Sequence, residues 1–383
     1  MPWRNLKRFF CKFFKQPLYA LDVLAKRAKA YLSYTFKNGK SSYPEAITLF
    51  LTHCCNLQCK MCGQWGEGGV TKKMSVDSIS QRLQLDSLKH LIDDVAFFKP
   101  NITLFGGEPL LYPECIELIR YIKDKNMHVL MITNGSILVK VAEQLVDAGL
   151  DELNVSLDGA SKLHDQIRGM PGVFSIITDG LKLINKYKRE KCSKKPLINL
   201  QCTITKYNYE HLEQLLDAAK EVEADSLTFH NLIFLGSDLI DKQKEYDKIL
   251  NCSSDDWKGF VFDPEINPDK LFDKIKTIQS KNHGFSVDFY PNLSQQGLKE
   301  YYRNPSYLPQ EYPRRCLSPW IVAYVFPDGQ VRPCLNSSYS FGNIAKNKFK
   351  DIWNADTAVK YRKILKQNKI FSVCVRCTEL YRY

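Results

Sequence analysis

Three closely spaced cysteines are the residues of this chain best suited to metal chemistry. Cys55, Cys59 and Cys62 are separated by three and then by two residues, directly after an apolar run at 46–51 that predicts a strand. The spacing suits a loop that wraps a cubane iron–sulfur cluster. Three thiolates leave one iron of a four-iron cluster without a protein ligand, and an open metal position is where catalytic sites do their chemistry. The pattern therefore predicts an enzyme.

A second group of cysteines lies near the C-terminal end of the chain, at Cys316, Cys334, Cys374 and Cys377. The last two form a Cys-x-x-Cys pair. Between the first two, Asp328-Gly329 predicts a hairpin turn that would bring Cys316 and Cys334 together. Four thiolates are soft ligands, and the spacing alone leaves tetrahedral zinc and an iron–sulfur cluster both open.

Composition limits the class of protein. The chain has 383 residues, 44% of them hydrophobic and 25% charged, as in a soluble globular protein with one large and one smaller domain. It has no apolar run of about 18 residues and no clear secretory signal, so we expect a cytoplasmic protein. In that reducing compartment the thirteen cysteines are metal ligands and buried thiols rather than disulfides.

Positive charge is concentrated at the N-terminal end. Residues 1–40 carry ten lysines or arginines against Asp22, which is +9 of the total charge of +12. The nearly neutral remainder does not favour nucleic-acid binding. Residues 3–15 place Trp3, Leu6, Phe10, Phe13 and Phe14 at helical spacing among basic residues. Such a helix packs its aromatic face on the base of the fold or lies at the inner face of the membrane, and RNA binding is a third, less favoured alternative.

The body of the chain alternates strand-like and helical runs. Strands are predicted at 46–53, 101–105, 128–133, 152–157, 198–205 and 226–230, with helical periodicity between them. This alternation predicts an α/β fold, a partial (β/α)6 barrel of parallel strands. We expect an N-terminal helical extension at 1–45, the barrel at 46–230, a connecting region at 231–315 and a small cysteine-rich domain at 316–383. A helix near 268–281 and a strand at 285–290 are predicted within the connecting region.

Polar residues recur where the predicted strands end. In such barrels the chemistry lies at the carboxyl ends of the strands. An amine acceptor, hydroxyl partners and a carboxylate partner on one side of the barrel predict a pocket for an amino-acid-bearing nucleoside. The residues concerned are Gly106, Gly107, Glu108, Thr133, Asn134, Ser156, Asp158 and Arg168.

This ordered combination resembles the radical S-adenosylmethionine (SAM) superfamily. The resemblance implies that the three cysteines at 55–62 hold a [4Fe-4S] cluster whose open iron binds SAM, and that a 5′-deoxyadenosyl radical is formed. It implies that Gly106, Gly107 and Glu108 contact the methionine amine, Ser156 the ribose and Arg168 the methionine carboxylate. Met61 stands where the family usually has an aromatic residue, a difference that affects packing near the adenine more than cluster ligation.

The C-terminal segment resembles the twitch and SPASM auxiliary-cluster domains, and the single-cluster twitch arrangement most closely. The resemblance favours a second [4Fe-4S] cluster over zinc. Four cysteines would leave it no open iron, so electron transfer is the role that remains. A net oxidation follows as a hypothesis: the adenosyl radical takes a hydrogen atom, a base takes a proton and the auxiliary cluster accepts the electron. A reductase such as flavodoxin or ferredoxin is the implied partner.

The substrate is less defined by the sequence. Only about 45 residues precede the first predicted strand, too few for the peptide-binding domain of many peptide-modifying relatives. We therefore expect a carbohydrate-like or lipid-linked small molecule, with peptide or protein maturation as the alternative. A non-enzymatic iron–sulfur electron carrier or scaffold is the rival of another class. Cys202 and Cys252 are candidate hydrogen-atom donors, although a lone cysteine is more often a packed thiol. His230 and Tyr290 lie near strand ends where substrate contact is conceivable.

Overall fold

Ten strands form one continuous sheet in the computed structural model, which describes residues 17–383. The sheet order is β10-β9-β8-β1-β2-β3-β4-β5-β6-β7. Strands β1 to β8 pair in parallel, and β8, β9 and β10 are joined antiparallel. The strands are β1 (Ala46–Phe50), β2 (Asn101–Phe105), β3 (Val129–Thr133), β4 (Glu152–Ser156), β5 (Leu197–Thr203), β6 (Ser226–His230), β7 (Ser286–Tyr290), β8 (Val322–Val325), β9 (Gln330–Arg332) and β10 (Gly342–Asn343).

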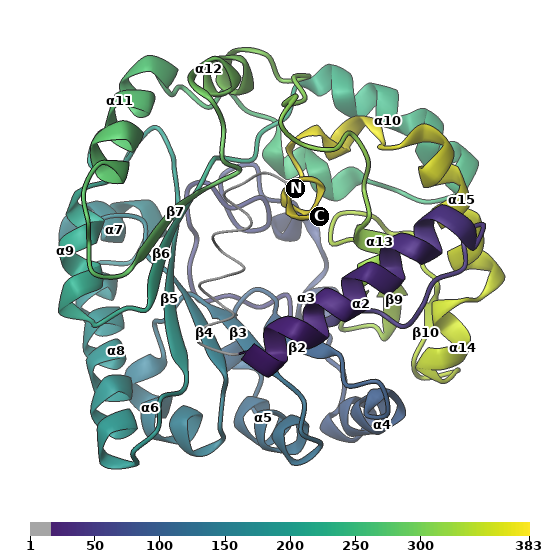
Figure 1. Cartoon of the computed structure of the whole chain (residues 1–383), viewed down its shortest axis with the longest axis horizontal. Helices are drawn as coiled ribbons and strands as arrows, with labels where there is room; N and C mark the ends of the chain where they lie inside the picture. Colours follow the sequence, from purple (N-terminus) through teal and green to yellow (C-terminus); the bar gives the residue numbers. More distant parts are fainter. Residues whose placement is uncertain (1–16) are drawn as a thin grey trace.

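Many of the helices surround the curved sheet and cover its outer face, whereas α2 crosses the opening of the barrel (Figure 1). The helices are α2 (Pro17–Phe36), α3 (Val76–Ser80), α4 (Leu85–Val95), α5 (Cys115–Asp124), α6 (Leu138–Asp147), α7 (Ser161–Arg168), α8 (Val173–Glu190), α9 (Gln214–Glu221), α10 (Ser237–Leu250), α11 (Pro268–Gln279), α12 (Gln295–Arg303), α13 (Ser318–Ile321), α14 (Phe349–Trp353), α15 (Asp356–Asn368) and α16 (Thr378–Arg382). Short 3₁₀ turns lie at η1 (Val70–Lys73), η2 (Pro109–Leu111), η3 (Asp255–Phe260) and η4 (Ser372–Arg376).

The main core lies between the sheet and these helices. Strand β5 shows why: Ile198, Leu200 and Cys202 are fully buried, whereas Gln201 and Thr203, between and after them, stay partly exposed. Because side chains alternate across a strand, apolar residues face the helices and polar residues face the inside of the barrel. The helices present matching apolar faces, as predicted from their periodicity.

The predicted α/β partial barrel is confirmed, and the sheet extends beyond the six predicted strands. Strand β7, from the connecting region, pairs with β6, and β8, from the cysteine-rich segment, pairs with β1. The boundaries expected at 230/231 and 315/316 therefore do not interrupt the sheet.

Helix α2 lies across the amino ends of the strands, opposite to the edge where the predicted pocket lies (Figure 1). Arg27 pairs with Glu45, just before β1, at 2.7 Å. Tyr19 stacks on His128, just before β3, with ring centroids 4.1 Å apart. The predicted amphipathic segment at 3–15 is outside the described residues. Within residues 17–383, no helix is both long enough and apolar enough to span a bilayer.

Candidate functional site

The loop after β1 carries the first cysteine group. A turn closes it, with the Cys62 amide donating to the Cys59 carbonyl at 3.0 Å, and the Lys60 amide ties it to the Ile167 carbonyl at 2.9 Å. Each of the three sulfurs accepts at least one N–H group, as a cluster-bound thiolate does. The donors are Asn134 Nδ2 to Cys55 at 3.8 Å, Arg168 Nη1 to Cys59 at 3.4 Å and the Trp65 backbone amide to Cys62 at 3.4 Å.

The glycine pair at the end of β2 packs directly against this loop. A Cβ atom on Gly106, where φ is +150°, would lie 2.6 Å from the Thr52 carbonyl oxygen, and one on Gly107 would lie 2.1 Å from that of Cys54. Only glycine fits at such distances. The Gly107 amide donates to Thr52 O and the Glu108 amide to Cys54 O, each at 2.8 Å. The pair thus holds the cysteine loop in place, whatever it also contributes to SAM binding.

Glu108 is buried at the carboxyl edge of the sheet and hydrogen-bonds to several groups there. Its carboxylate accepts hydrogen bonds from Thr133 Oγ1 and the Asn134 amide, both at 2.7 Å, and from the Leu110 amide at 3.0 Å. Burial raises the pKa of this carboxyl, and these hydrogen bonds oppose that rise. Glu108 therefore links the ends of β2 and β3 and sets the loop that carries Asn134. Its contact with the methionine amine stays a prediction.

Asp158 and Arg168 form a buried ion pair beside the cysteines. Arg168 Nη2 lies 2.6 Å from Asp158 Oδ2, and the Thr203 amide donates to Asp158 Oδ1 at 2.8 Å. Burial opposes the charge on Arg168, but the Asp158 carboxylate and the Cys59 thiol hold its pKa above the ordinary value. Both Asp158 oxygens are thus engaged within the protein. We infer that Asp158 acts by orienting Arg168 toward Cys59 rather than by touching a ligand.

All the predicted SAM-pocket residues lie at the carboxyl edge of β1 to β4 or in the helix that follows β4. Asn134 and Arg168 are joined to the cysteine sulfurs directly, and Ser156 is partly exposed at the end of β4. The sequence did not single out Trp65, whose Nε1 donates to the His53 carbonyl at 2.9 Å and so positions its own amide toward Cys62. The only signal was its place three residues after the last cysteine.

His164 supports Asp158 and makes stability depend on pH. Its Nδ1 accepts the Asp158 amide at 3.0 Å, and burial lowers its pKa from 6.5 to about 3. In the unfolded chain the His164 imidazole becomes protonated as the pH falls through 6.5. In the folded protein it becomes protonated only near pH 3. The stability that neutral His164 contributes is thus complete above pH 6.5 and is lost as the pH falls toward 3.

Between pH 6.5 and 5 we expect the free energy of unfolding to fall by about 2 kcal/mol more in the wild type than in His164→Gln. Anaerobic urea unfolding at the two pH values measures this difference. If the free energy of unfolding fell equally in the two proteins, His164 would not be the source of the pH dependence.

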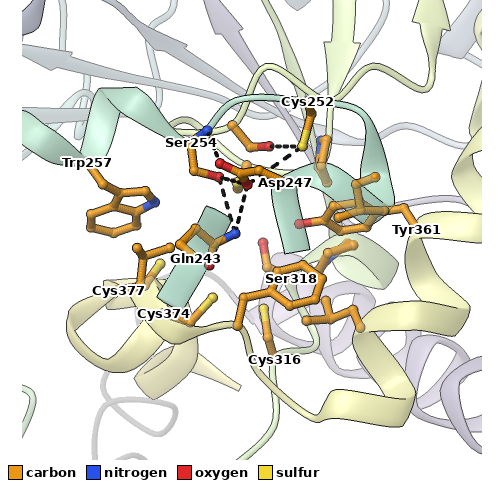
Figure 2. A pocket seen from close by; sticks show the side chains of 18 of the residues that line it. Gln243, Asp247, Cys252, Ser254, Trp257, Cys316, Ser318, Tyr361, Cys374 and Cys377 are labelled. Carbon is orange, nitrogen blue, oxygen red and sulfur yellow. Dashed lines mark hydrogen bonds between the residues drawn. The ribbon is translucent and has the colours of Figure 1, made fainter. Parts of the chain in front are cut away.

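The second cysteine group lines one cavity, with Cys316, Cys334, Cys374 and Cys377 on its walls (Figure 2). Burial raises the pKa of Cys374 and Cys377 to about 12, so bound metal is what would convert them to thiolates. Four thiols around one cavity are a soft donor set that fits an iron–sulfur cluster, with one thiolate for each iron.

Cys252 lies on the wall of this same cavity, which the sequence did not predict. It follows α10, and Figure 2 shows it beside Asp247. Its Sγ lies 3.9 Å from Asp247 Oδ1, and Ser337 Oγ donates to it at 3.9 Å. Cys202 is fully buried in the core on the outer face of β5, and Asn208 Nδ2 donates to its sulfur at 3.6 Å. Neither position favours the predicted role of hydrogen-atom donor to a substrate inside the barrel.

Arg376, between Cys374 and Cys377, is a structural anchor that sequence reasoning missed. It is fully buried, and its guanidinium donates to the carbonyls of Tyr301, Asn304 and Tyr307, each at 2.7 Å. These groups lie at and after the carboxyl end of α12, where a cation satisfies free carbonyls. A charged residue inside the Cys-x-x-Cys pair was the available signal.

Comparison with known proteins matches two segments of the chain to known families. Residues 49–219 match the radical SAM superfamily, and residues 316–378 match the SPASM iron-sulfur cluster-binding domain. The chain is 28% identical to the AdoMet-dependent heme synthase of Methanosarcina barkeri, over 87% of this chain and 88% of that protein. It is 21% identical to the tungsten-containing aldehyde ferredoxin oxidoreductase cofactor-modifying protein of Pyrococcus furiosus, over 87% and 86%.

Solved structures share the fold. Streptococcus suis SuiB bound to precursor peptide SuiA superposes with a TM-score of 0.60 at 15% identity, over 92% of this chain and 75% of that one. The structure of anSMEcpe with bound AdoMet gives 0.54 at 21% identity, over 84% and 83%.

The chain contains a radical SAM domain at residues 49–219 and a SPASM iron–sulfur cluster-binding domain at residues 316–378. It is a radical SAM enzyme whose cofactors are SAM and two [4Fe-4S] clusters. Cys55, Cys59 and Cys62 would hold the first cluster, and the four cysteines of the C-terminal cavity the second.

Proposed function

We propose that this enzyme carries out a net oxidation of a carbohydrate-like small molecule and that the auxiliary cluster accepts one electron. The observation that carries the proposal is the cavity at the second site, where four thiols line the walls. Four ligands complete a four-iron cluster and leave no iron for substrate, so electron transfer is the role left to it. With both cofactors bound, the first site supplies a 5′-deoxyadenosyl radical that removes a hydrogen atom.

The inner face of the barrel supports a polar substrate. Along β4 to β6 it presents Asn154, Asn199, Gln201 and His230, all partly exposed. Amide and imidazole groups of this kind exchange hydrogen bonds with hydroxyl groups. The similarity to AdoMet-dependent heme synthases along most of the chain also favours a small molecule over a peptide. The proposed small molecule includes lipid-linked forms. The alternative function is the maturation of a peptide or protein.

We propose that His230 is the base that accepts the proton lost by the substrate. Its Nε2 lies 2.6 Å from Gln201 Oε1, which orients the imidazole, and its ring meets the Tyr290 ring edge-on at 5.7 Å between centroids. Histidine is the side chain most often used for such a transfer near neutral pH. A reductase such as flavodoxin or ferredoxin would deliver the electron that starts each turnover.

Removing the auxiliary cluster tests the proposal. We expect a Cys374→Ala, Cys377→Ala variant to keep its first cluster and to release 5′-deoxyadenosine when reduced with SAM. It should not restore the metabolite profile of a deletion strain, because the substrate radical cannot be oxidised. Iron content, EPR spectra and mass spectrometry of strain extracts measure these results.

Cys192→Ala, at an exposed cysteine, is the matched control and should behave as the wild type. Normal product from the double variant would refute electron transfer to the auxiliary cluster.

A further inference from the structure

Helix α2 exposes a continuous apolar stripe to solvent. Its large side chains recur at spacings that place them along one side of the helix. Isolated exposed apolar residues are ordinary, but an aligned group of this length marks an interaction surface. We call it the outer stripe: Leu18 (82% exposed), Leu21 (50%), Leu24 (52%), Leu32 (57%) and Phe36 (77%).

The opposite face of α2 fixes the outer stripe in its outward orientation. Ala20, Ala30 and Ser33 are buried against the fold. The Arg27–Glu45 ion pair and the Tyr19–His128 stack hold the same face on the amino ends of the strands. Turning α2 to bury the stripe would break these contacts, so the stripe stays available to a partner.

The charge around the outer stripe favours an anionic partner. Lys29 is exposed on α2, and Lys37 and Lys40 are exposed just after it. Residues 1–16, which lead directly into α2, add Arg4, Lys7, Arg8, Lys12 and Lys15 to the sequence without any acidic residue. An apolar helix face flanked by lysine and arginine has the chemistry of a helix that lies in the surface of an anionic bilayer.

We propose that the outer stripe docks this enzyme onto an anionic phospholipid surface. The stripe lies at the amino ends of the strands, and the cysteine loop and SAM pocket lie at their carboxyl ends (Figure 1). A docked molecule therefore presents its active site to the aqueous side, away from the lipid. The inference goes beyond the proposed reaction and does not depend on it.

Vesicle co-sedimentation of the full chain tests the docking. We expect binding to vesicles that contain phosphatidylglycerol, weaker binding to phosphatidylcholine alone, and loss of binding as salt rises. The Leu21→Ser, Leu32→Ser variant should bind phosphatidylglycerol vesicles about tenfold more weakly, because two apolar side chains no longer enter the bilayer. Val139→Ser, Ile249→Ser changes two exposed apolar residues on other helices and should bind as the wild type.

Three results would overturn the docking. Unchanged vesicle binding by the stripe variant would assign any lipid contact to residues 1–16 alone. Unchanged binding with a lower melting temperature would mean that part of the chain covers the stripe. A dimer of the wild type that the stripe variant loses, seen by light scattering without vesicle binding, would make a second copy the partner. Release of 5′-deoxyadenosine from reduced protein and SAM should be equal in all variants, so the docking and the reaction are tested separately.

Discussion

Asp158→Ala is expected to destabilise the protein by about 3–5 kcal/mol, because it leaves the buried Arg168 guanidinium without its carboxylate. The ion pair is 2.6 Å long, and Asp158 is fully buried. The Thr203 amide also loses its acceptor. Arg168 is released from the orientation that aims it at Cys59, so 5′-deoxyadenosine release should fall about 10- to 100-fold, as for other changes around metal ligands.

Two further variants separate charge from shape in this prediction. Asp158→Asn keeps an acceptor for the Thr203 amide and should lose less stability than Asp158→Ala. Combining Asp158→Leu with Arg168→Met removes both charges and should recover part of the stability that Asp158→Ala loses. Cleavage of SAM should stay low in this double variant. Anaerobic denaturant unfolding and the yield of 5′-deoxyadenosine are the measurements. A loss below about 1 kcal/mol in Asp158→Ala would show that the pair is not the anchor described here.

Arg376→Met is expected to destabilise the C-terminal domain by about 3–5 kcal/mol and to release its cluster, while the first cluster remains. Three carbonyls lose their donor, and each buried acceptor left unpaired costs about 1–3 kcal/mol. The guanidinium also stacks on the Tyr301 ring, 4.1 Å from its centroid. Because Cys374 and Cys377 flank Arg376, loss of this anchor frees two ligands together. Iron per chain should fall from about eight toward four, the content of one cluster in place of two.

Arg303→Met on α12 is the matched control. Its side chain is 64% exposed and lies 3.5 Å from Asp269, so it should change stability by less than about 1 kcal/mol. If Arg376→Met kept both clusters through repeated gel filtration, the anchoring role would be wrong.

Much of the first site was predictable because its chemistry is encoded locally. The spacing of Cys55, Cys59 and Cys62 confines three thiols to one short loop, whatever the rest of the chain does. The glycine pair and Asn134 follow strands whose apolar alternation is readable, and parallel strands bring their carboxyl ends to one edge. The fold class followed from the same patterns, whereas the cofactors followed from the resemblance to the radical SAM superfamily.

The roles of single polar residues were less predictable. Asp158 and Glu108 are residue types that often bind ligands, yet in the structure their carboxylates are engaged by Arg168, by the Thr133 hydroxyl and by backbone amides. A motif states which groups are close to one another but not how many of their hydrogen bonds are already satisfied. That depends on burial, which is a property of the packed molecule.

The sequence by itself indicated the radical SAM class, placed Cys55, Cys59 and Cys62 in one short loop and predicted the alternation of strands and helices, since each is read from motif spacing or from the periodicity of apolar residues. Only the tertiary structure decided that β7 and β8 complete the sheet and that Cys252 joins the second cavity. It also decided that Arg376 anchors α12 and that α2 turns its leucines outward. These features depend on contacts between distant segments, which are selected by packing and by the pairing of buried polar groups rather than by local spacing.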